Sequence, residues 1–257
     1  MRQSSPDRFG RIKAHPPHAE PGQMIGLLGG SFNPPHAAHK MISETALKRL
    51  GLDKVWWVVT PGNPLKRRSE LAPLSDRLML CRKLATNRNI EVTDFETDLP
   101  SAYTYATLAF LKSRSPLVRF VWLMGADNLA EMERWHRWRE IFGLFPIAVV
   151  DRPGWRLRAL SSKPARAYAR QRLPESQAKM LAHNPPPTWI FLTGPLSQLS
   201  STALRAKGRR RAEAVAKKAQ GPGELPWKRP KKEVAAPAVQ PSPATERTPE
   251  TEPAQGS

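Results

Sequence analysis

Six short apolar runs, separated by longer amphipathic stretches, constrain the fold of this chain more than any other feature. The runs expected to form strands are 24–28, 54–60, 90–95, 118–124, 146–151 and 188–193. The stretches expected to form helices are 36–50, 75–87, 104–113, 128–143, 160–171 and 201–207. Several of the runs are apolar on both faces, as parallel strands covered by helices on both sides require. The alternation predicts one α/β domain with an open, mostly parallel, doubly wound (Rossmann-like) sheet and helices on both faces.

Composition divides the chain into three parts. Residues 1–22 and 208–257 lack apolar periodicity and are rich in proline and charge, so we expect them to be disordered extensions of a domain at 23–207. Of the net charge of +19, residues 1–23 carry +2 and residues 206–257 carry +5, which leaves +12 for the core. A strongly basic domain attracts polyanions in general, and its charge does not distinguish nucleotides from nucleic acids or anionic lipids.

Cysteine content and hydropathy restrict the compartment. Cys81 is the single cysteine, which excludes an internal disulfide and a thiolate metal cluster, and its helical pattern predicts a buried apolar residue. No apolar stretch has the length of a secretory signal or of a bilayer span. We therefore expect a cytoplasmic protein that does not bind membranes.

The first expected strand runs into a segment suited to phosphate. Gly29 and Gly30 carry no Cβ, so a polyphosphate can approach the backbone N–H groups closely. Two prolines then lead into a helix in which His36 and His39 are three residues apart and project from the same face of the first turn. The dipole and the unpaired N–H groups at a helix start favour an anion there.

Two further segments carry groups that bind phosphate or sugar. Ser200, Ser201 and Thr202 stand at an expected helix start, and Arg205 lies four residues after Ser201, where its guanidinium can grip a phosphate with two hydrogen bonds. Asp127 follows a buried strand, where it can accept from a ribose hydroxyl, orient a magnesium-bound water, or cap the next helix.

Taken together, six ordered segments resemble the nucleotidyltransferase superfamily with an H-x-G-H signature, and within it the bacterial nicotinate-nucleotide adenylyltransferase family. They are G-G-S-F-N-P…H-A-A-H at 29–39, P-G-N-P-L-K at 61–66, Y-T-Y-A-T-L at 103–108, G-A-D-N at 125–128, W-H-R-W at 135–138 and L-S-S-T-A-L-R at 199–205. Ala38 replaces the family's glycine and Leu65 replaces its histidine. The resemblance spans nearly the whole core.

The resemblance also implies roles for individual residues. ATP would be bound by Gly29, Gly30, Ser31, Phe32, His36, His39, Ser200, Ser201, Thr202 and Arg205. Nicotinate mononucleotide would be bound by Asn33, Lys66, Thr104, Gly125, Ala126, Asp127, Trp135 and His136, with Trp135 stacking on the pyridine ring. The expected catalytic residues are His36, His39 and Arg205. Mg²⁺ is the expected cofactor, bound mainly through the ATP phosphates and not by protein side chains.

The reaction implied is adenylyl transfer from ATP to nicotinate mononucleotide in NAD biosynthesis. One alternative is a related adenylyl- or cytidylyltransferase that uses nicotinamide mononucleotide or phosphopantetheine, since the sequence does not decide between acid and amide. A second is a basic nucleic-acid-binding protein, although no recognisable RNA- or DNA-reading module is present and only non-specific contacts by the basic tail are expected. Zinc binding by the two histidines lacks a carboxylate or cysteine at the matching spacing. The oligomeric state and the role of the tail are not predicted.

Overall fold

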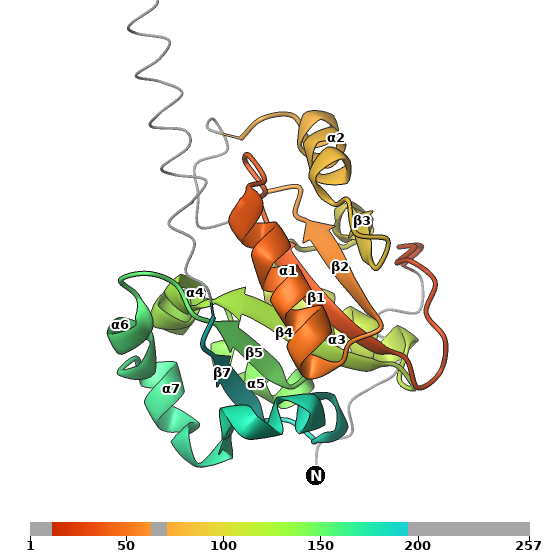
Figure 1. Ribbon diagram of the computed structural model, residues 1–257. Coiled ribbons are helices and arrows are strands. Elements are labelled where there is room, and N and C mark those ends of the chain that lie inside the picture. Colours follow the sequence, from red (N-terminus) through yellow and green to blue (C-terminus); the bar gives the residue numbers. More distant parts are fainter. Residues whose placement is uncertain (1–11, 63–70, 195–257) are drawn as a thin grey trace, which may run out of the picture. The chain divides into compact units, whose positions relative to one another are not determined.

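The computed structural model describes residues 12–62 and 71–194, and in this part of the chain the predicted parallel sheet is present (Figure 1). Its strands are β1 (Met24–Gly30), β2 (Lys54–Val59), β3 (Ile90–Thr93), β4 (Arg119–Gly125), β5 (Ile147–Val150), β6 (Arg172–Leu173) and β7 (Trp189–Leu192). The order across the sheet is β3-β2-β1-β4-β5-β7-β6, and every described pairing is parallel. All six predicted strands are therefore confirmed, and the two-residue edge strand β6 is the addition.

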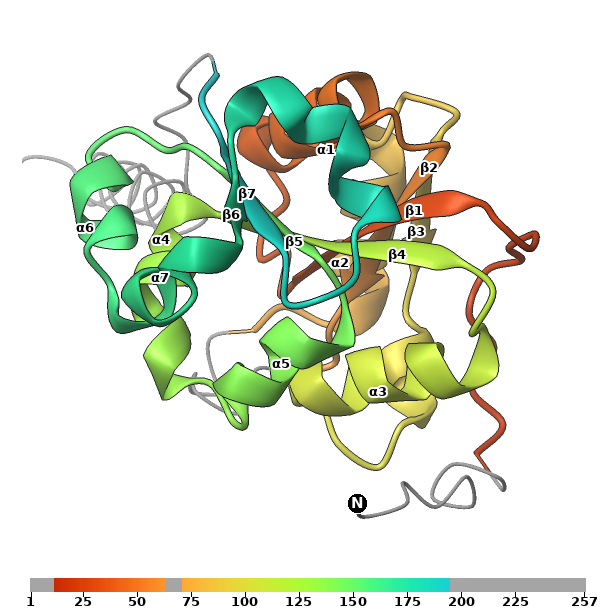
Figure 2. The same ribbon diagram turned by 90° about the horizontal axis from the view of Figure 1, so that it is seen from below.

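Helices cover both faces of the sheet, which confirms the doubly wound arrangement (Figure 2). The α-helices are α1 (Ala37–Leu50), α2 (Leu74–Leu84), α3 (Thr104–Arg114), α4 (Ala126–Glu131), α5 (Trp138–Leu144), α6 (Arg156–Leu160) and α7 (Lys163–Ala167). Short 3-10 helices are η3 (Phe95–Asp98), η4 (Met132–Arg134), η5 (Ala169–Gln171) and η6 (Glu175–His183). Helices α1, α2 and η6 pack on one face, and α3 to α7 pack on the other.

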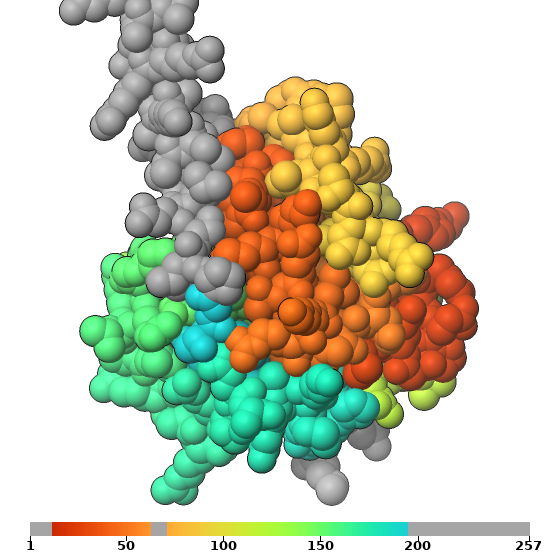
Figure 3. Space-filling view, viewed as in Figure 1, coloured from red at the N-terminus to blue at the C-terminus, as the bar shows by residue number. Residues whose placement is uncertain are grey.

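The strands are apolar on both faces because each face has its own core. Leu27 of β1 lies beside Trp56 of β2 and faces the core under α3 to α7, whereas the next pair, Leu28 and Trp57, faces the core under α1, α2 and η6. All four side chains are buried, and each contributes roughly 1.5–3 kcal/mol or more by leaving water. On the second face, α1 lies next to η6, as the orange and teal surfaces in Figure 3 show.

The helix predicted at 128–143 is wrong in its continuity. The structure has α4, then η4, then α5, because the chain leaves the helical conformation between them. Trp135 is extended, with φ −78° and ψ 140°. Arg137 is left-handed, with φ 56°. This break turns the 135–137 segment into a loop, so Trp135 and His136 are not part of a helix as predicted.

The helix predicted at 160–171 is likewise divided, into α6, α7 and η5. Pro164 lies in the first turn of α7, where a missing N–H is harmless, but a continuous helix through this position would lose a backbone hydrogen bond. The Ser162 hydroxyl accepts from the Ala165 N–H at 3.4 Å and starts the new helix. Proline therefore marks a helix start where the apolar spacing indicated a helix interior.

Part of the expected N-terminal extension packs against the domain. Ala14 is only 8% exposed and belongs to the core under α3, and the Ile12 carbonyl accepts from Arg114 Nη2 at 2.8 Å. The Gly22 N–H donates to the Leu117 carbonyl at 2.8 Å. Residues 12–22 are therefore ordered, unlike the prediction. The contacts hold them on the domain although their sequence lacks apolar periodicity. Residues 1–11, the helix predicted at 201–207 and the tail at 208–257 lie outside the described residues.

Membrane insertion of a helix finds no support in residues 12–62 and 71–194. None of the helices there combines the length and the apolar character needed to cross a bilayer.

Cys81 is buried in the core under α2, and burial raises the pKa of its thiol to about 12, as expected of an apolar core residue.

Candidate active site

The predicted site lies where the chain changes direction across the sheet. From β1 the chain proceeds outward to β2 and β3, and it then returns to the other side of β1 to form β4 and β5. Ligands in open parallel sheets bind beyond the carboxyl ends of the strands at this kind of switch point. The loop with His36 and His39 follows β1, and Asp127 follows β4, so two of the predicted motifs meet here.

Gly29 and Gly30 have different reasons to lack a side chain. A Cβ on Gly29 would lie 2.4 Å from Cη2 of Trp122 on the neighbouring strand, so the indole occupies the space that a side chain would need. A Cβ on Gly30 would lie 3.4 Å from the Phe32 ring, which is an ordinary contact. The prediction attributed both glycines to close approach of phosphate, whereas packing already accounts for Gly29.

Phe32 supports the site from inside the protein. Its ring is buried and stacks on Trp57, with 5.2 Å between ring centroids, and it contacts the His39 ring at 4.5 Å. Its backbone is left-handed, with φ 43°, which is rare for an aromatic residue and turns the chain sharply after β1. The side chain is therefore in the core, so a contact of Phe32 with ATP would have to come from its main chain.

His36 and His39 are in direct contact at the start of α1, as their spacing predicted. Their ring centroids are 3.9 Å apart, and the backbone N–H of His36 donates to Nδ1 of His39 at 3.1 Å. Because Nδ1 of His39 accepts, the ring proton of its neutral form resides on Nε2. His39 can therefore donate a hydrogen bond from Nε2. Nδ1 of His36 is buried and has no hydrogen-bond partner among the described residues.

Both imidazoles are neutral in the unliganded protein. Burial, followed by the nearby charge of Arg152, lowers the pKa of His36 from 6.5 to about 4. Burial, followed by the neighbouring His36, lowers the pKa of His39 to about 3. Neutral rings still donate through one N–H each, so they can bind phosphate oxygens, and a bound polyphosphate would raise both pKa values.

An ion pair joins the ends of β4 and β5 at the same edge. Arg152, which follows β5, binds the Asp127 carboxylate through Nη1, and Asp127 lies in the first turn of α4. A Cβ on Gly125 would lie 2.4 Å from Oδ1 of Asp127, so glycine leaves room for this carboxylate. Asp151 is 4% exposed and binds Nε and Nη2 of Arg156. The sequence prediction missed Arg152 and Asp151, although their place directly after a buried strand was the available signal.

The described residues predicted to receive the mononucleotide lie at the ends of strands, at the starts of helices and in loops. Thr104 is the first residue of α3, and the ring of Tyr103 before it contacts the His136 ring at 4.8 Å. Trp135 is half-buried against the core under α3 to α7, and His136 is exposed. Oδ1 of Asn33 accepts from the Ala72 N–H at 3.2 Å, so this side chain also holds the loop before α2.

Arg77 is a structural part of the site that the sequence did not reveal. It is 1% exposed, and its guanidinium donates to the carbonyl oxygens of Ser31 at 2.7 Å, Thr60 at 2.8 Å and Ala72 at 3.0 Å. One side chain therefore ties together the loops after β1 and β2 and the start of α2. An arginine in an amphipathic helical pattern is ordinarily exposed, so its spacing carried no signal.

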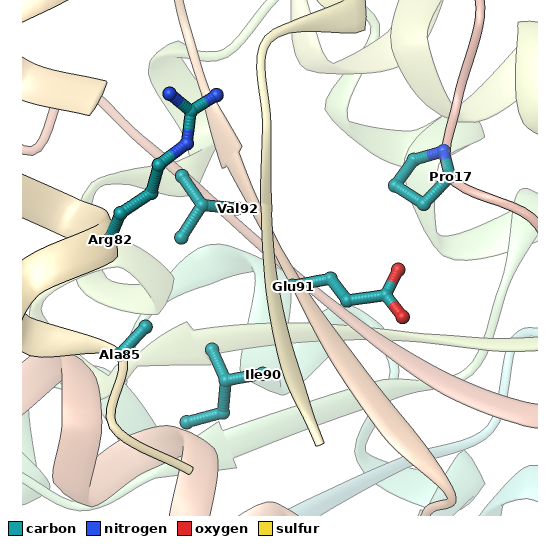
Figure 4. A pocket seen from close by; sticks show the side chains of 6 residues that line it. All are labelled: Pro17, Arg82, Ala85, Ile90, Glu91 and Val92. Carbon is teal, nitrogen blue, oxygen red and sulfur yellow. The ribbon is translucent and has the colours of Figure 1, made fainter. Parts of the chain in front are cut away.

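Several predicted site residues are not described by the structure. Lys66 and the segment with Ser200, Ser201, Thr202 and Arg205 lie outside the described residues. Within the parts that are described, no group of three or more His, Cys, Asp or Glu side chains is arranged to hold a metal. A hollow of about 350 Å³ beside β3 and a second of about 320 Å³ between α1 and η6 contain none of the predicted residues; the first is lined by Pro17, Arg82, Ala85, Ile90, Glu91 and Val92 (Figure 4).

Comparison with known proteins identifies the family. Residues 27–207 match the family described as Cytidylyltransferase-like. A probable nicotinate-nucleotide adenylyltransferase of Agrobacterium fabrum is 56% identical over 182 residues, which cover 71% of this chain and 97% of the relative. The chain belongs to the nicotinate-nucleotide adenylyltransferase family. A second probable member, from Mesorhizobium japonicum, is 55% identical over 194 residues, which cover 75% of this chain and all of that relative.

Two solved structures of a nicotinic acid mononucleotide adenylyltransferase share the fold. The nicotinic acid mononucleotide adenylyltransferase of Plasmodium falciparum, complexed with NaAD, superimposes with a TM-score of 0.53 at 19% identity and covers 72% of this chain and 83% of that chain. The same protein complexed with APC gives a TM-score of 0.50 at the same identity and coverage. At this identity the likeness concerns the fold alone, and it agrees with the predicted Rossmann-like class.

Proposed function

We propose that this chain transfers the adenylyl group of ATP to nicotinate mononucleotide, forming nicotinate adenine dinucleotide (deamido-NAD) and pyrophosphate in NAD biosynthesis. The contact between His36 and His39 at the carboxyl end of β1 carries the proposal, because it presents the Nε2–H of His39 beside a helix start. Membership of the adenylyltransferase family supports the same reaction.

The chemistry requires alignment more than acid–base catalysis. The 5′-phosphate of the mononucleotide is ionised at neutral pH, so it attacks the α-phosphorus without a base. A new oxygen–phosphorus bond forms, the bond from the α-phosphorus to the bridging oxygen breaks, and pyrophosphate leaves with the electron pair. Hydrogen bonds from fixed donors stabilise the charge that develops on the phosphate oxygens.

Residues of this chain supply several such donors. His39 donates from Nε2, His36 donates from its ring N–H, and the first N–H groups of α1 favour an anion. Arg152 adds a positive charge close to both rings. We include Ser200, Ser201, Thr202 and Arg205 in the proposed ATP site on the strength of their motif.

Mg²⁺ is part of this proposal as the partner of ATP. Magnesium prefers oxygen ligands, whereas the groups described around the histidine pair are two imidazoles and two aspartates, Asp127 and Asp151, each already paired with an arginine. These residues fit a Mg²⁺ ion that is held by the phosphates of ATP with no side-chain cage, and when bound it would neutralise pyrophosphate charge.

The cytoplasmic location predicted from the sequence stays a prediction.

The acceptor residues belong to the proposal as well. Trp135 would stack on the pyridine ring, while Thr104 and the backbone beside His136 would bind the carboxylate of nicotinate. Lys66 would face the phosphate of the mononucleotide, and Asn33, Gly125, Ala126 and Asp127 would line the remaining surface. The half-buried indole of Trp135 and the helix start at Thr104 support this arrangement.

An acceptor comparison tests the proposed function. Pyrophosphate release should be measured with ATP, Mg²⁺ and one of three acceptors: nicotinate mononucleotide, nicotinamide mononucleotide or 4′-phosphopantetheine. We expect kcat/KM for the acid to exceed that for the amide by about tenfold or more, since the amide lacks the charge that the site would bind with charge-assisted hydrogen bonds. Equal or faster turnover of either other acceptor would contradict the assignment.

A further inference from the structure

A buried glutamate behind the proposed acceptor site has no part in the mechanism described so far. Glu96 lies in η3, directly after β3, and is 6% exposed. Its Oε1 accepts from the hydroxyl of Thr107, which is 1% exposed in the second turn of α3. The Thr60 hydroxyl, directly after β2, is close enough to act on the charge of this carboxyl group. Glu96 therefore connects three elements that end or begin at the same edge of the sheet.

The second oxygen of this carboxyl group is unusual. Oε2 of Glu96 is buried and has no hydrogen-bond partner among the described residues. An ionised carboxylate with an unpaired buried oxygen is costly, whereas a neutral carboxyl group is far less so. Burial raises the pKa of Glu96, and the hydroxyl groups of Thr107 and Thr60 oppose this effect. The described residues that act on its charge are hydroxyl groups, with no cation among them.

The position of Thr107 links Glu96 to the acceptor. Thr104 and Thr107 are three residues apart on α3 and share one side of the helix, so a bond that fixes Thr107 also fixes the first turn. The Thr60 hydroxyl donates to the Gly62 carbonyl at 3.1 Å, in the turn directly after β2. The α3 end of this connection thus adjoins Thr104, a residue proposed to bind the mononucleotide.

We propose that Glu96 is a positioning residue for the acceptor site, acting as a neutral carboxyl group that ties the first two turns of α3 to the carboxyl end of β2. The inference rests on the proposed function, since it concerns the binding of nicotinate mononucleotide. A neutral group holds the helix start in place without adding negative charge behind the carboxylate of the acceptor.

Steady-state kinetics of three full-length variants test the proposal. Glu96→Gln keeps the shape and an accepting oxygen without a charge, so its KM for nicotinate mononucleotide should stay within about threefold of the wild type. Glu96→Ala and Thr107→Val each remove the bond, and we expect each to raise this KM about tenfold. The KM for ATP should change by less than about twofold in all three, because the ATP site lies on other elements.

Asp98→Asn is the matched control, since Asp98 is an exposed carboxylate in the same short helix. Thermal unfolding of every variant separates loss of fold from loss of positioning, and Thr107→Val serves if Glu96→Ala does not fold. If the KM of Glu96→Gln for nicotinate mononucleotide is as high as that of Glu96→Ala, the proposal that Glu96 acts as a neutral carboxyl group is wrong. An unchanged KM in Thr107→Val, or an equal rise in both substrates' KM values, would overturn the positioning role. Failure of the wild type to use nicotinate mononucleotide would instead contradict the proposed function.

Discussion

His39 combines a structural task with the catalytic task that we propose for it. Its Nδ1 accepts from the His36 backbone and its face packs on Phe32, so the ring orientation is set before ATP arrives. Such preorganisation is what gives a single donor a large effect on rate, because no reorganisation is needed at the moment of reaction.

Replacement of His39 by alanine should therefore abolish most of the activity. We expect kcat to fall by about 10²–10³, the usual cost of one oxyanion donor, while the protein stays folded. Pyrophosphate release and circular dichroism measure the two properties side by side. Full activity of His39→Ala would defeat the catalytic assignment.

The depressed histidine pKa values also predict how stability depends on pH. The folded-state pKa values, about 4 for His36 and about 3 for His39, lie below the ordinary value of 6.5. The unfolded chain therefore binds protons first as pH falls, so the contribution of these rings to stability is complete above pH 6.5 and is lost toward pH 3.

Urea unfolding between pH 7 and 4 measures this loss. One pKa unit corresponds to about 1.4 kcal/mol, and we expect the free energy of unfolding to fall by on the order of 3 kcal/mol after allowance for solvent exposure of His36. The double variant His36→Asn, His39→Asn should show a flatter profile over the same range. Identical slopes in both proteins would assign the loss to other groups.

Among single residues, the sequence predicted those whose role follows from neighbours close in the chain. It missed those whose role depends on tertiary contacts. The contact between His36 and His39 follows from their helical spacing. Burial of Arg77 and Glu96, by contrast, depends on loops far away in the chain. Charged residues are rarely fully buried, so neither the composition nor the spacing around these two positions pointed to the interior.

Among the elements, the packing of β1 against β4 explains one of the two glycines before the histidine loop. Alanine at position 29 would place its Cβ 2.4 Å from the Trp122 ring, whereas alanine at position 30 would meet the Phe32 ring at 3.4 Å. We expect Gly29→Ala to lower the free energy of unfolding by about 1–3 kcal/mol and Gly30→Ala to change it less.

Chemical denaturation of the two alanine variants checks this difference. In a Gly29→Ala protein, Trp122→Phe should restore part of the loss, because a smaller ring frees space for the methyl group. Equal destabilisation at both positions would show that backbone conformation, and not the indole, requires the glycine.

Helix α2 stabilises two loops through Arg77, and a charge-conserving substitution tests this. Lysine cannot donate to the carbonyls of Ser31, Thr60 and Ala72 with the geometry of a guanidinium, so unsatisfied buried oxygens would remain. We expect Arg77→Lys to destabilise the protein by about 2–3 kcal/mol.

Arg82→Lys is the control, since Arg82 is exposed on the same helix. Its free energy of unfolding should stay within about 0.5 kcal/mol of the wild type. Thermal unfolding of both variants provides the measurement. If the two lysine substitutions have the same effect, the bonds made by Arg77 do not hold the loops.

Element boundaries were predictable where periodicity and capping agree, and not where a loop interrupts an apolar pattern. The strands β1 to β5 and β7 follow directly from the apolar runs. The stretch 128–143 keeps helical apolar spacing through a break at Trp135 and Arg137, because residues on both sides of the break face the same core. Spacing alone reports which residues are buried, and a turn between two short helices can leave that pattern intact.

For the whole molecule, the extent of the family match predicts which parts of the chain the reaction needs. The match ends at residue 207, and the relative from Agrobacterium fabrum aligns with 71% of this chain. A chain that ends at Lys207 should keep kcat/KM within about twofold, because the tail has no counterpart in the proposed mechanism. A chain that ends at Pro195 should lose adenylyl transfer, since it lacks the segment from Ser200 to Arg205.

Pyrophosphate release by the two truncated proteins, with circular dichroism as a check on folding, measures this prediction. Loss of activity in the longer protein would place residues 208–257 in the reaction. Activity in the shorter one would remove Arg205 from the proposed catalytic set.

The sheet consists of two consecutive parts of the sequence, β1 to β3 and β4 to β7, and the pairing of β1 with β4 joins them. The first part brings the histidine pair, and the second brings Asp127 and Arg152, so neither part alone contains both groups. A chain divided near Pro116, between α3 and β4, would give two fragments that each lack part of the proposed site. Adenylyltransferase activity would then appear only when the two fragments associate. The topology thus makes this protein a natural starting point for a split reporter of protein association.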